Sequence, residues 1–191
     1  MILSILICSL EERQAQLATL LESIHSQIEV LQAKNEVEII SVIDNRQATT
    51  GAKRNMLLAL ADGKYSVFVD DDDELHGDYV TEILEAAKQD ADCITFNGFM
   101  TTNGVNKMPF DIALNNPYKL EVINRIPTYL RFPNHITPIK HDIAIQVQFE
   151  DKTFGEDYSW ANEIRNRGLL KTEAKINKEL YHYKFITNKR K

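Results

Sequence analysis

Three short apolar runs, each followed by a segment of helical character, constrain the fold of this chain more than any other feature. The runs are ILSILIC (2–8), EVEIISVID (36–44) and KYSVFVD (64–70). Apolar residues recur at helical spacing after the first and third runs, between 17 and 31 and between 79 and 88. Three successive strand-helix units predict an α/β fold whose mostly parallel sheet has right-handed crossovers.

The second unit and the later part of the chain add further elements. Residues 51–60 are rich in Ala and Leu, which favours a helix with Thr50 as its N-cap. Asn103-Gly104 lies between two strand-like runs and predicts a hairpin or an antiparallel edge on the parallel sheet. Residues 155–168 predict a helix closed by the glycine at its end, and residues 179–185 predict a final strand.

Length, charge and cysteine content limit the classes of protein to consider. At 191 residues the chain is long enough for one sizeable core and too short for two. Its net charge of -6 argues against a nucleic-acid partner held by general electrostatics. Cys8 and Cys93 lie in strand-like runs, which indicates buried thiols and a reducing cytoplasm.

No targeting or membrane-spanning segment is evident in the sequence. The apolar first ten residues lack a preceding positive region and run into Glu11 and Glu12, so a first strand is expected instead of a signal peptide. No other stretch approaches the ~20 apolar residues that span a bilayer. We therefore expect no transmembrane segment and a cytoplasmic location.

The third apolar run ends in five consecutive acids, Asp70 to Glu74. Two carboxylates ~5 Å apart repel by roughly 3 kcal/mol at an effective dielectric near 20, so this crowding needs compensation. Because side chains alternate along a strand, Asp70 and Asp72 are expected to point the same way. Such a pair suits Mg²⁺ or Mn²⁺ together with a diphosphate. The alternative is a solvated acidic turn that caps the next helix.

Ligands of open α/β sheets bind beyond the carboxyl ends of the strands. That rule places Ser9, Glu11 and Asp44 at the same edge of the sheet as the acidic run. These side chains are candidates for contact with a ligand there. For Asp44, a turn-closing role is an equally good interpretation.

The stretch GAKRNMLLALADGKYSVFVDDDDEL (51–75) resembles the donor-site core of family 2 glycosyltransferases of the GT-A fold. In that family an Ala-Arg-Asn-like triplet opens a helix, A-x-G-x-Y leads into an apolar strand, and the strand ends in D-x-D-D. The corresponding residues here are Lys53-Arg54-Asn55, then Ala61, Gly63 and Tyr65, then Asp70, Asp72 and Asp73. Downstream, FGEDYSW followed by R-x-R-G resembles the family's Glu-Asp motif, with Glu156 and Asp157. The resemblance covers about residues 2–100 and 150–170.

The resemblance implies a single GT-A domain, with residues 1–100 as the nucleotide-sugar donor half and 101–191 as the acceptor half. It implies transfer of one sugar from a nucleotide-diphosphate sugar, with UDP expected as the carrier, to a glycan or other hydroxyl acceptor. The motifs of processive synthases are absent. Where the family usually has Pro-x-Tyr-Asn-Arg after the first strand, only Arg13 matches.

The same resemblance implies roles for individual residues. It makes Asp72 the principal ligand of Mn²⁺ or Mg²⁺, with Asp70 at the ribose or at the metal through water. It makes Asp157 the general base of an inverting displacement, with Glu156 beside it. A further set is implied to contact the donor: Ser9, Glu11, Asp44, Arg54, Asn55, Asp70 and Asp71. Without the resemblance, Arg54 reads equally well as a surface arginine, and the acids at 156 and 157 read as residues of a helix start.

Three further side chains carry two interpretations each. His135 lies just before the Glu-Asp motif and is a candidate for the acceptor side, or a locally bonded loop residue. Trp160 would stack on a sugar or be buried against the sheet. His182 would complete the metal coordination or serve a structural role in its strand.

Two other functions remain as alternatives. A sugar-1-phosphate nucleotidyltransferase would have a similar sheet, but it requires a glycine-rich phosphate loop after the first strand, where this chain has SLEERQ. A catalytically silent relative that binds nucleotide or Ca²⁺ is the second alternative. Intact acids at 70, 72 and 157 count against it.

Overall fold

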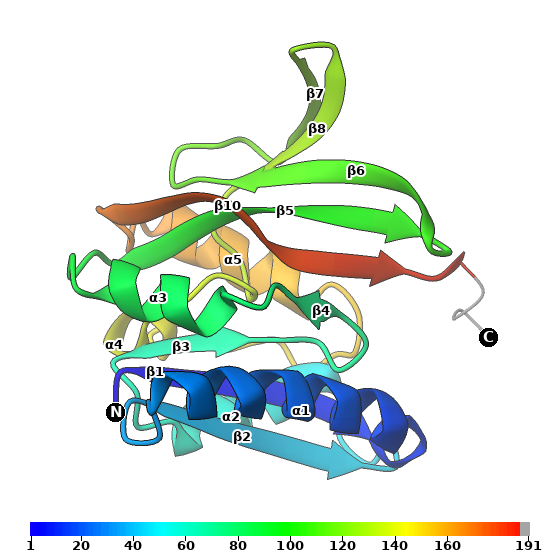
Figure 1. Ribbon diagram of the computed structural model, residues 1–191, viewed down its shortest axis with the longest axis vertical. Helices are drawn as coiled ribbons and strands as arrows, with labels where there is room; N and C mark the ends of the chain where they lie inside the picture. Colours follow the sequence, from blue (N-terminus) through cyan, green and yellow to red (C-terminus); the bar gives the residue numbers. More distant parts are fainter. Residues whose placement is uncertain (188–191) are drawn as a thin grey trace.

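The computed structural model describes residues 1–187 and has an α/β architecture built on a ten-stranded sheet (Figure 1). The strands are β1 (Leu3–Leu10), β2 (Val37–Asp44), β3 (Tyr65–Phe68), β4 (Glu74–Leu75), β5 (Cys93–Thr102), β6 (Val105–Ile112), β7 (Lys119–Ile123), β8 (Ile126–Arg131), β9 (Ile139–Lys140) and β10 (Glu173–Phe185). The helices are the short 3₁₀ helix η1 (Glu11–Arg13) and the α-helices α1 (Gln14–Leu31), α2 (Thr50–Leu60), α3 (Tyr79–Ala87), α4 (His141–Ala144) and α5 (Glu156–Asn166).

The first half of the chain forms the parallel part of the sheet. β1 pairs in parallel with β2 on one side and with β3 on the other. The register aligns Leu10 with Asp44, so the carboxyl ends of β1 and β2 meet at one edge of the sheet. The three strand-helix units predicted from the apolar runs are therefore confirmed.

The second half adds the antiparallel part. β9 pairs antiparallel with both β3 and β5, and β5 and β6 form the predicted hairpin around Asn103 and Gly104. Both turn residues have positive φ, 52° and 78°. β10 is longer than predicted, begins at Glu173, and runs parallel to β5.

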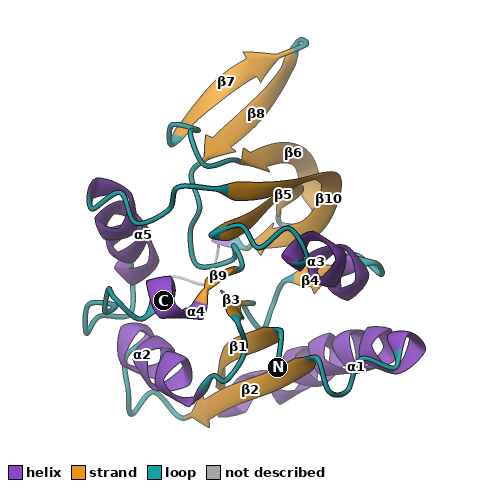
Figure 2. Ribbon diagram, turned by 90° about the vertical axis from the view of Figure 1, so that its left-hand side faces the viewer, coloured by secondary structure: helices purple, strands orange, loops and turns teal. Residues whose placement is uncertain are grey.

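Helices cover both faces of the sheet (Figure 2). One apolar cluster joins α1 and α3 to alternate residues of β1 such as Ile5 and Ile7. A second cluster joins α2, α4 and α5 to Leu6, which lies between Ile5 and Ile7 in β1, and to Phe68 of β3. Because both faces are buried, the central strands are nearly continuous apolar runs, which made them easy to recognise.

Two local predictions are wrong. The N-cap of α2 is Thr49 and not Thr50, since the Thr49 hydroxyl oxygen accepts a 3.1 Å hydrogen bond from the amide of Ala52. β3 ends at Phe68, so the acidic run forms a turn and does not continue the strand. The amide of Asp73 donates to the carbonyl oxygen of Asp70 within that turn, at 3.1 Å.

The helix that carries Glu156 and Asp157 is bounded by two glycines, of which Gly168 was predicted to close it. Gly155 precedes α5 with φ of 75°, and Gly168 follows it with φ of 57°. The Gly168 amide donates to the carbonyl oxygen of Arg165 at 2.9 Å and satisfies one of the free carbonyls at the helix end. Within residues 1–187 the model contains no helix of sufficient length and apolarity to cross a membrane.

Candidate active site

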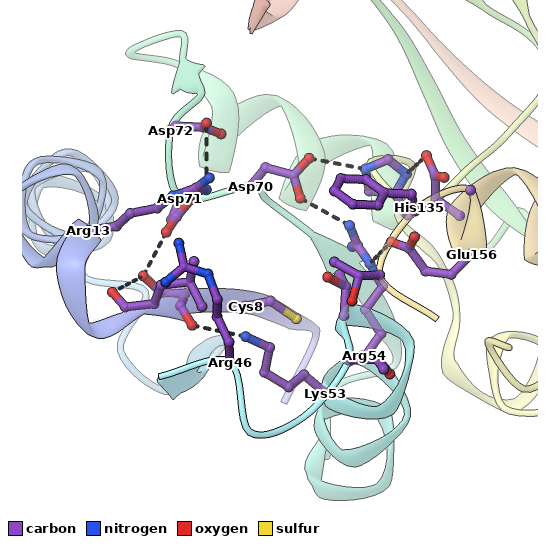
Figure 3. A pocket seen from close by; sticks show the side chains of 18 of the residues that line it. Cys8, Arg13, Arg46, Lys53, Arg54, Asp70, Asp71, Asp72, His135 and Glu156 are labelled. Atoms are coloured by element: carbon purple, nitrogen blue, oxygen red, sulfur yellow. Dashed lines mark hydrogen bonds and ion pairs between the residues drawn. The ribbon is translucent and has the colours of Figure 1, made fainter. Parts of the chain in front are cut away.

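A cavity of about 630 Å³ lies at the carboxyl ends of β1 and β3 (Figure 3). Its walls come from the end of β1, the loop before α2, the first turns of α2, the acidic turn, the start of α5 and residues 183–187. The size is that of a typical small-ligand site. Segments from both halves of the chain therefore meet around one cavity.

Asp71 closes the wall of the cavity beside β1. Its side chain is 2% exposed, and its two carboxylate oxygens accept hydrogen bonds from the Ser9 hydroxyl at 2.7 Å and from Nη1 of Arg13 at 2.8 Å. Ser9 and Asp71, both predicted to contact the donor, line the cavity and are bonded to each other.

Asp73 fixes the other side of the acidic turn. It is buried and accepts 2.8 Å hydrogen bonds from the Tyr181 hydroxyl and from the Lys184 amide, both on β10. Burial raises the pKa of this carboxyl well above its ordinary value, and the nearby charge of Asp70 adds to the effect. The turn is thus attached to β1 through Asp71 and to β10 through Asp73.

Arg54 lies between two acids of the cavity. Its buried guanidinium donates to Asp70 at 3.1 Å and to Glu156 at 3.3 Å, and it lies 4.8 Å from the centre of the Phe68 ring. Burial raises the pKa of Asp70, but Arg54 and His135 outweigh it and hold this pKa well below the ordinary value. Burial also raises the pKa of Glu156, and the charge of Arg54 offsets only part of that rise. Arg54, the positive group predicted at the donor site, is therefore present. It is paired with Asp70 from the first half of the chain and with Glu156 from the second.

His135 lies between Asp70 and Asp157. Its Nε2 is 3.4 Å from Oδ2 of Asp70, and its Nδ1 is 3.3 Å from Oδ2 of Asp157. The ring is only 12% exposed, and the Nδ1 contact does not have hydrogen-bond geometry, so that buried nitrogen has no hydrogen-bond partner. The backbone holds the ring in place because the His135 carbonyl accepts a 2.9 Å hydrogen bond from the amide of Phe68. The predicted acceptor-side histidine thus contacts the predicted base directly.

Asp157 is the more accessible member of the Glu-Asp pair. Its side chain is 37% exposed and lines the cavity, whereas the Glu156 side chain is 5% exposed. Both acids lie in the first turn of α5, where the helix dipole stabilises negative charge. Glu156 and Asp157 therefore lie both at a helix start and at the cavity, because the N-terminus of α5 points at the cavity.

Asp70 and Asp72 both line the cavity but face different neighbours (Figure 3). Asp70 faces Arg54 and His135, while Asp72 has a carboxylate oxygen 3.7 Å from Nη1 of Arg13. Within residues 1–187, no three His, Cys, Asp or Glu side chains are grouped so as to hold a metal ion by themselves. The expectation that these two side chains point the same way is therefore wrong, because strand alternation ends with β3 at Phe68. Mg²⁺ commonly takes one or two carboxylates and completes its shell with phosphate oxygens and water, so a metal here would need such further ligands.

Three residues predicted to contact the donor do not line the cavity. Glu11 is an exposed residue of η1. Asp44 accepts hydrogen bonds from Nζ of Lys53 at 2.7 Å and from the Ala48 amide at 2.8 Å, which matches the turn-closing interpretation. Asn55 is turned toward the chain that precedes α5, where its amide group makes 2.9 and 2.8 Å hydrogen bonds with the backbone of Phe149.

Asn55 belongs to a close contact between α2 and the segment before α5. Gly51 is part of the same contact: its amide donates to the carbonyl oxygen of Lys152 at 3.0 Å, and a Cβ at position 51 would lie 1.9 Å from the carbonyl oxygen of Glu150. Glycine is therefore required at the start of α2. The contact fixes the segment that leads into Glu156.

Trp160 and His182 were also candidates for the site, but neither residue lines the cavity. Trp160 is buried, donates from Nε1 to the carbonyl oxygen of Val147 at 2.9 Å, and stacks on Phe149. Both ring nitrogens of His182 are engaged, with Thr101 at 2.8 Å and Glu74 at 2.9 Å, and the residue does not line the cavity. The structural interpretation holds for both side chains.

Arg13 and Lys53 are two of the cations of the cavity wall that were not among the predicted site residues. Lys53 is buried and joins the ends of two strands, donating to the Ser9 carbonyl at 3.1 Å and to Asp44 at 2.7 Å. Arg13 reaches Asp71 from η1. The signal for both was present, since Arg13 matches the family pattern and Lys53 belongs to the triplet that opens α2.

Comparisons with known proteins agree with this geometry. The sequence matches the family model described as Glycosyl transferase family 2 over residues 40–154, which is more than half of the chain. The structure of S. aureus TarS 1-349 in complex with UDP is similar over 96% of this chain and 60% of that chain, with a TM-score of 0.67 and 13% identity. The complex of TarS 1-349 with UDP-GlcNAc is similar over 96% and 58%, with a TM-score of 0.66 and 12% identity.

No curated protein matches the sequence. The chain spans about 60% of the TarS 1-349 chain, and the identity of 13% establishes a shared fold and nothing further.

Proposed function

Because the chain belongs to glycosyl transferase family 2, we propose that it transfers one sugar from a nucleotide-diphosphate sugar to a hydroxyl group of an acceptor, with inversion. One observation carries this proposal: His135 contacts both Asp70, in the acidic turn that follows β3, and Asp157, at the start of α5. A donor-side acid and a candidate base thus face one cavity of about 630 Å³.

The donor is a UDP-sugar in this proposal. Support comes from the shared fold with TarS, whose structures include complexes with UDP and with UDP-GlcNAc. Cations that line the cavity, among them Arg13, Lys53 and Arg54, lower the cost of bringing a diphosphate to an edge rich in acids. The position of Ser9 and Asp71 in the wall supports a role in shaping the donor pocket.

Mn²⁺ or Mg²⁺ is the cofactor in this proposal, with Asp72 as the main protein ligand and Asp70 beside it. When bound, such an ion stabilises the negative charge that develops on the departing diphosphate. Arg54 holds the Asp70 carboxylate in its ionised form and fixes its direction through the 3.1 Å contact.

Asp157 is the general base in this proposal. An acceptor hydroxyl is a poor nucleophile at neutral pH, so a carboxylate must take its proton during the displacement. The partly exposed Asp157 can reach a hydroxyl group in the cavity, while the buried Glu156 is held by Arg54. His135 lies against the Asp157 carboxylate at 3.3 Å and forms part of the surface on which a glycan or other hydroxyl acceptor would lie.

The direct test is the thermal stability of the full chain with Mn²⁺, UDP and UDP-GlcNAc, separately and together. A ligand at 100 times its Kd stabilises the native state by about 2.7 kcal/mol, which raises Tm measurably. We expect stabilisation by the nucleotide that requires the metal and is lost in Asp72→Ala. Asp62→Ala is the matched control, because Asp62 is an exposed acid away from the cavity.

Other outcomes separate the alternatives. Stabilisation by Ca²⁺ without nucleotide would identify a silent binding relative. Equal stabilisation of the wild type and Asp72→Ala by metal and nucleotide would remove the assignment of Asp72. No stabilisation by any sugar nucleotide, with or without metal, would contradict the proposed function.

A further inference from the structure

The hairpin of β7 and β8 projects from the body of the protein (Figures 1 and 2) and ends the sheet. β7 pairs with β8 on one side, and within residues 1–187 no strand pairs with its other edge. β7 contains no proline and its pairing with β8 shows no bulge, so the usual features that protect an edge strand are reduced to its short length and the charges of Lys119 and Glu121.

One face of this hairpin is apolar and open to solvent. Leu120 and Val122 are 50% and 71% exposed, and they lie on the same face because side chains alternate along the strand. Their partners across the pair are Tyr129 and Pro127. A strand with a free edge and an exposed apolar face favours pairing with another strand.

The turn determines which backbone groups face the free edge. Asn124 and Arg125 have φ of 51° and 68°, as in a two-residue type I′ turn. Ile123 and Ile126 flank that turn as a hydrogen-bonded pair, so alternation along the antiparallel ladder makes Leu120 and Val122 the non-hydrogen-bonded positions. Their N–H and C=O groups therefore point outward. Pro127, which has no N–H, lies opposite Val122, as this assignment requires.

We propose that β7 pairs antiparallel with β7 of a second copy of the chain, around a twofold axis at Leu120. In this register the outward N–H and C=O groups of Leu120 bond to those of Leu120 of the partner subunit. Lys119 then lies opposite Glu121 of the partner subunit, and by symmetry Glu121 lies opposite Lys119 of the partner subunit. Both are close, non-hydrogen-bonded pairs of opposite charge.

The competing register is less favourable. Shifting the axis by one residue to Glu121 places the two Glu121 side chains directly opposite each other, and like charges at opposed positions are destabilising. In the monomer, Lys119 pairs with Glu121 of its own strand. Dimerisation exchanges the two intrastrand pairs, one in each copy, for two pairs between the copies, and it places Leu120 beside Leu120 of the partner subunit.

The contact is small, since β7 has five residues. Interfaces of stable complexes bury about 1,200–2,000 Å², which exceeds what one short strand pair supplies. The dimer is therefore weak and depends on concentration. The pairing does not depend on the proposed sugar transfer.

Sedimentation velocity of the full chain from low micromolar to several hundred micromolar concentration tests this proposal. We expect a monomer-dimer equilibrium in the wild type. Lys119→Glu or Glu121→Lys creates two opposed like-charge pairs and raises the dimer Kd by about tenfold or more, while the double variant restores pairing. Lys34→Glu makes the same charge change at an exposed site on another part of the molecule and serves as the control.

Two further measurements use the backbone assignment. Amide exchange followed by NMR should slow with rising protein concentration at Leu120 and Val122 and stay constant at Glu121, whose amide faces β8. Leu120→Pro removes the outward N–H at the axis without touching the bonds to β8, so it should give a monomer. A wild-type monomer at every concentration, or a dimer indifferent to Lys119→Glu, would overturn the proposal.

Discussion

Nδ1 of His135 lies 3.3 Å from Oδ2 of Asp157, although the two residues come from a loop and a helix separated by more than one element. The opposite ring nitrogen contacts Asp70 at 3.4 Å. One side chain therefore lies between the candidate base and the acidic turn. In a displacement, the base and the leaving diphosphate must lie on opposite faces of the sugar, so this spacing matters to the reaction.

His135→Gln is expected to reduce turnover while leaving nucleotide binding unchanged. The glutamine keeps a polar group but loses the two-sided contact, so Asp157 is less well oriented, and kcat should fall by about tenfold to a hundredfold. Release of UDP from UDP-GlcNAc measures turnover, and the Tm shift with UDP and Mn²⁺ measures binding. His25→Gln, at an exposed position of α1, is the control. A purely structural His135 would instead lower the Tm and leave kcat of the folded enzyme intact.

Asp157→Asn is expected to remove most of the activity. General base catalysis contributes about 10²–10⁴-fold, and an amide cannot accept the proton. Because Asp157 is partly exposed and lies at the helix start, Asn should preserve the fold, as judged by an unchanged Tm and an unchanged response to UDP. Normal turnover of this variant with a true acceptor would exclude Asp157 as the base.

Two neighbouring acids should give opposite results on substitution. Asp71→Ala removes a buried carboxylate bonded to Ser9 and Arg13, so the free energy of unfolding should fall by about 2–4 kcal/mol. Asp72→Ala should change it by about 1 kcal/mol or less, because this side chain is 21% exposed and its contact with Arg13 is long, while the metal-dependent Tm shift disappears. Urea unfolding of both variants makes the comparison, and the reverse pattern would exchange the two roles.

Much of the fold could be predicted because local patterns and burial agree. The central strands are buried on both faces, so the sequence shows them as continuous apolar runs, and the amphipathic α1 and α3 show helical spacing. The acidic turn could not be predicted in detail. Asp71 and Asp73 are fixed by Ser9 and Tyr181, which are 62 and 108 positions away in the chain. No local pattern reports such contacts.

The candidate site shows the same division. The end of a strand and the start of a helix identified Asp70 and Asp157, because parallel strands place their carboxyl ends at one edge. The resemblance to a family singled out Asn55 but did not predict what its side chain contacts. A side-chain amide can form hydrogen bonds with a ligand or with the backbone equally well. Here it bonds the backbone of Phe149, 94 positions away.

Asn55→Ala should therefore affect stability before it affects binding. It removes two hydrogen bonds and leaves the backbone groups of Phe149 without partners, so the free energy of unfolding should fall by about 2 kcal/mol. Asn162→Ala, which removes one exposed hydrogen bond to Tyr158, should change it by about 0.5 kcal/mol or less. Equilibrium urea denaturation compares the two. A folded Asn55→Ala of unchanged stability that no longer binds UDP would restore the donor-contact interpretation.

Cys8 lines the cavity, yet its thiol should react slowly with iodoacetamide at pH 8. Burial raises its pKa to about 11, so only roughly one thiol in a thousand is ionised at this pH. The greater nucleophilicity of the thiolate offsets part of this, which leaves a rate about tenfold to a hundredfold below that of the urea-unfolded chain. The rate should rise about tenfold per pH unit from 7 to 9. Alkylation followed by mass spectrometry measures it, and rapid, pH-independent labelling of Cys8 would contradict this environment.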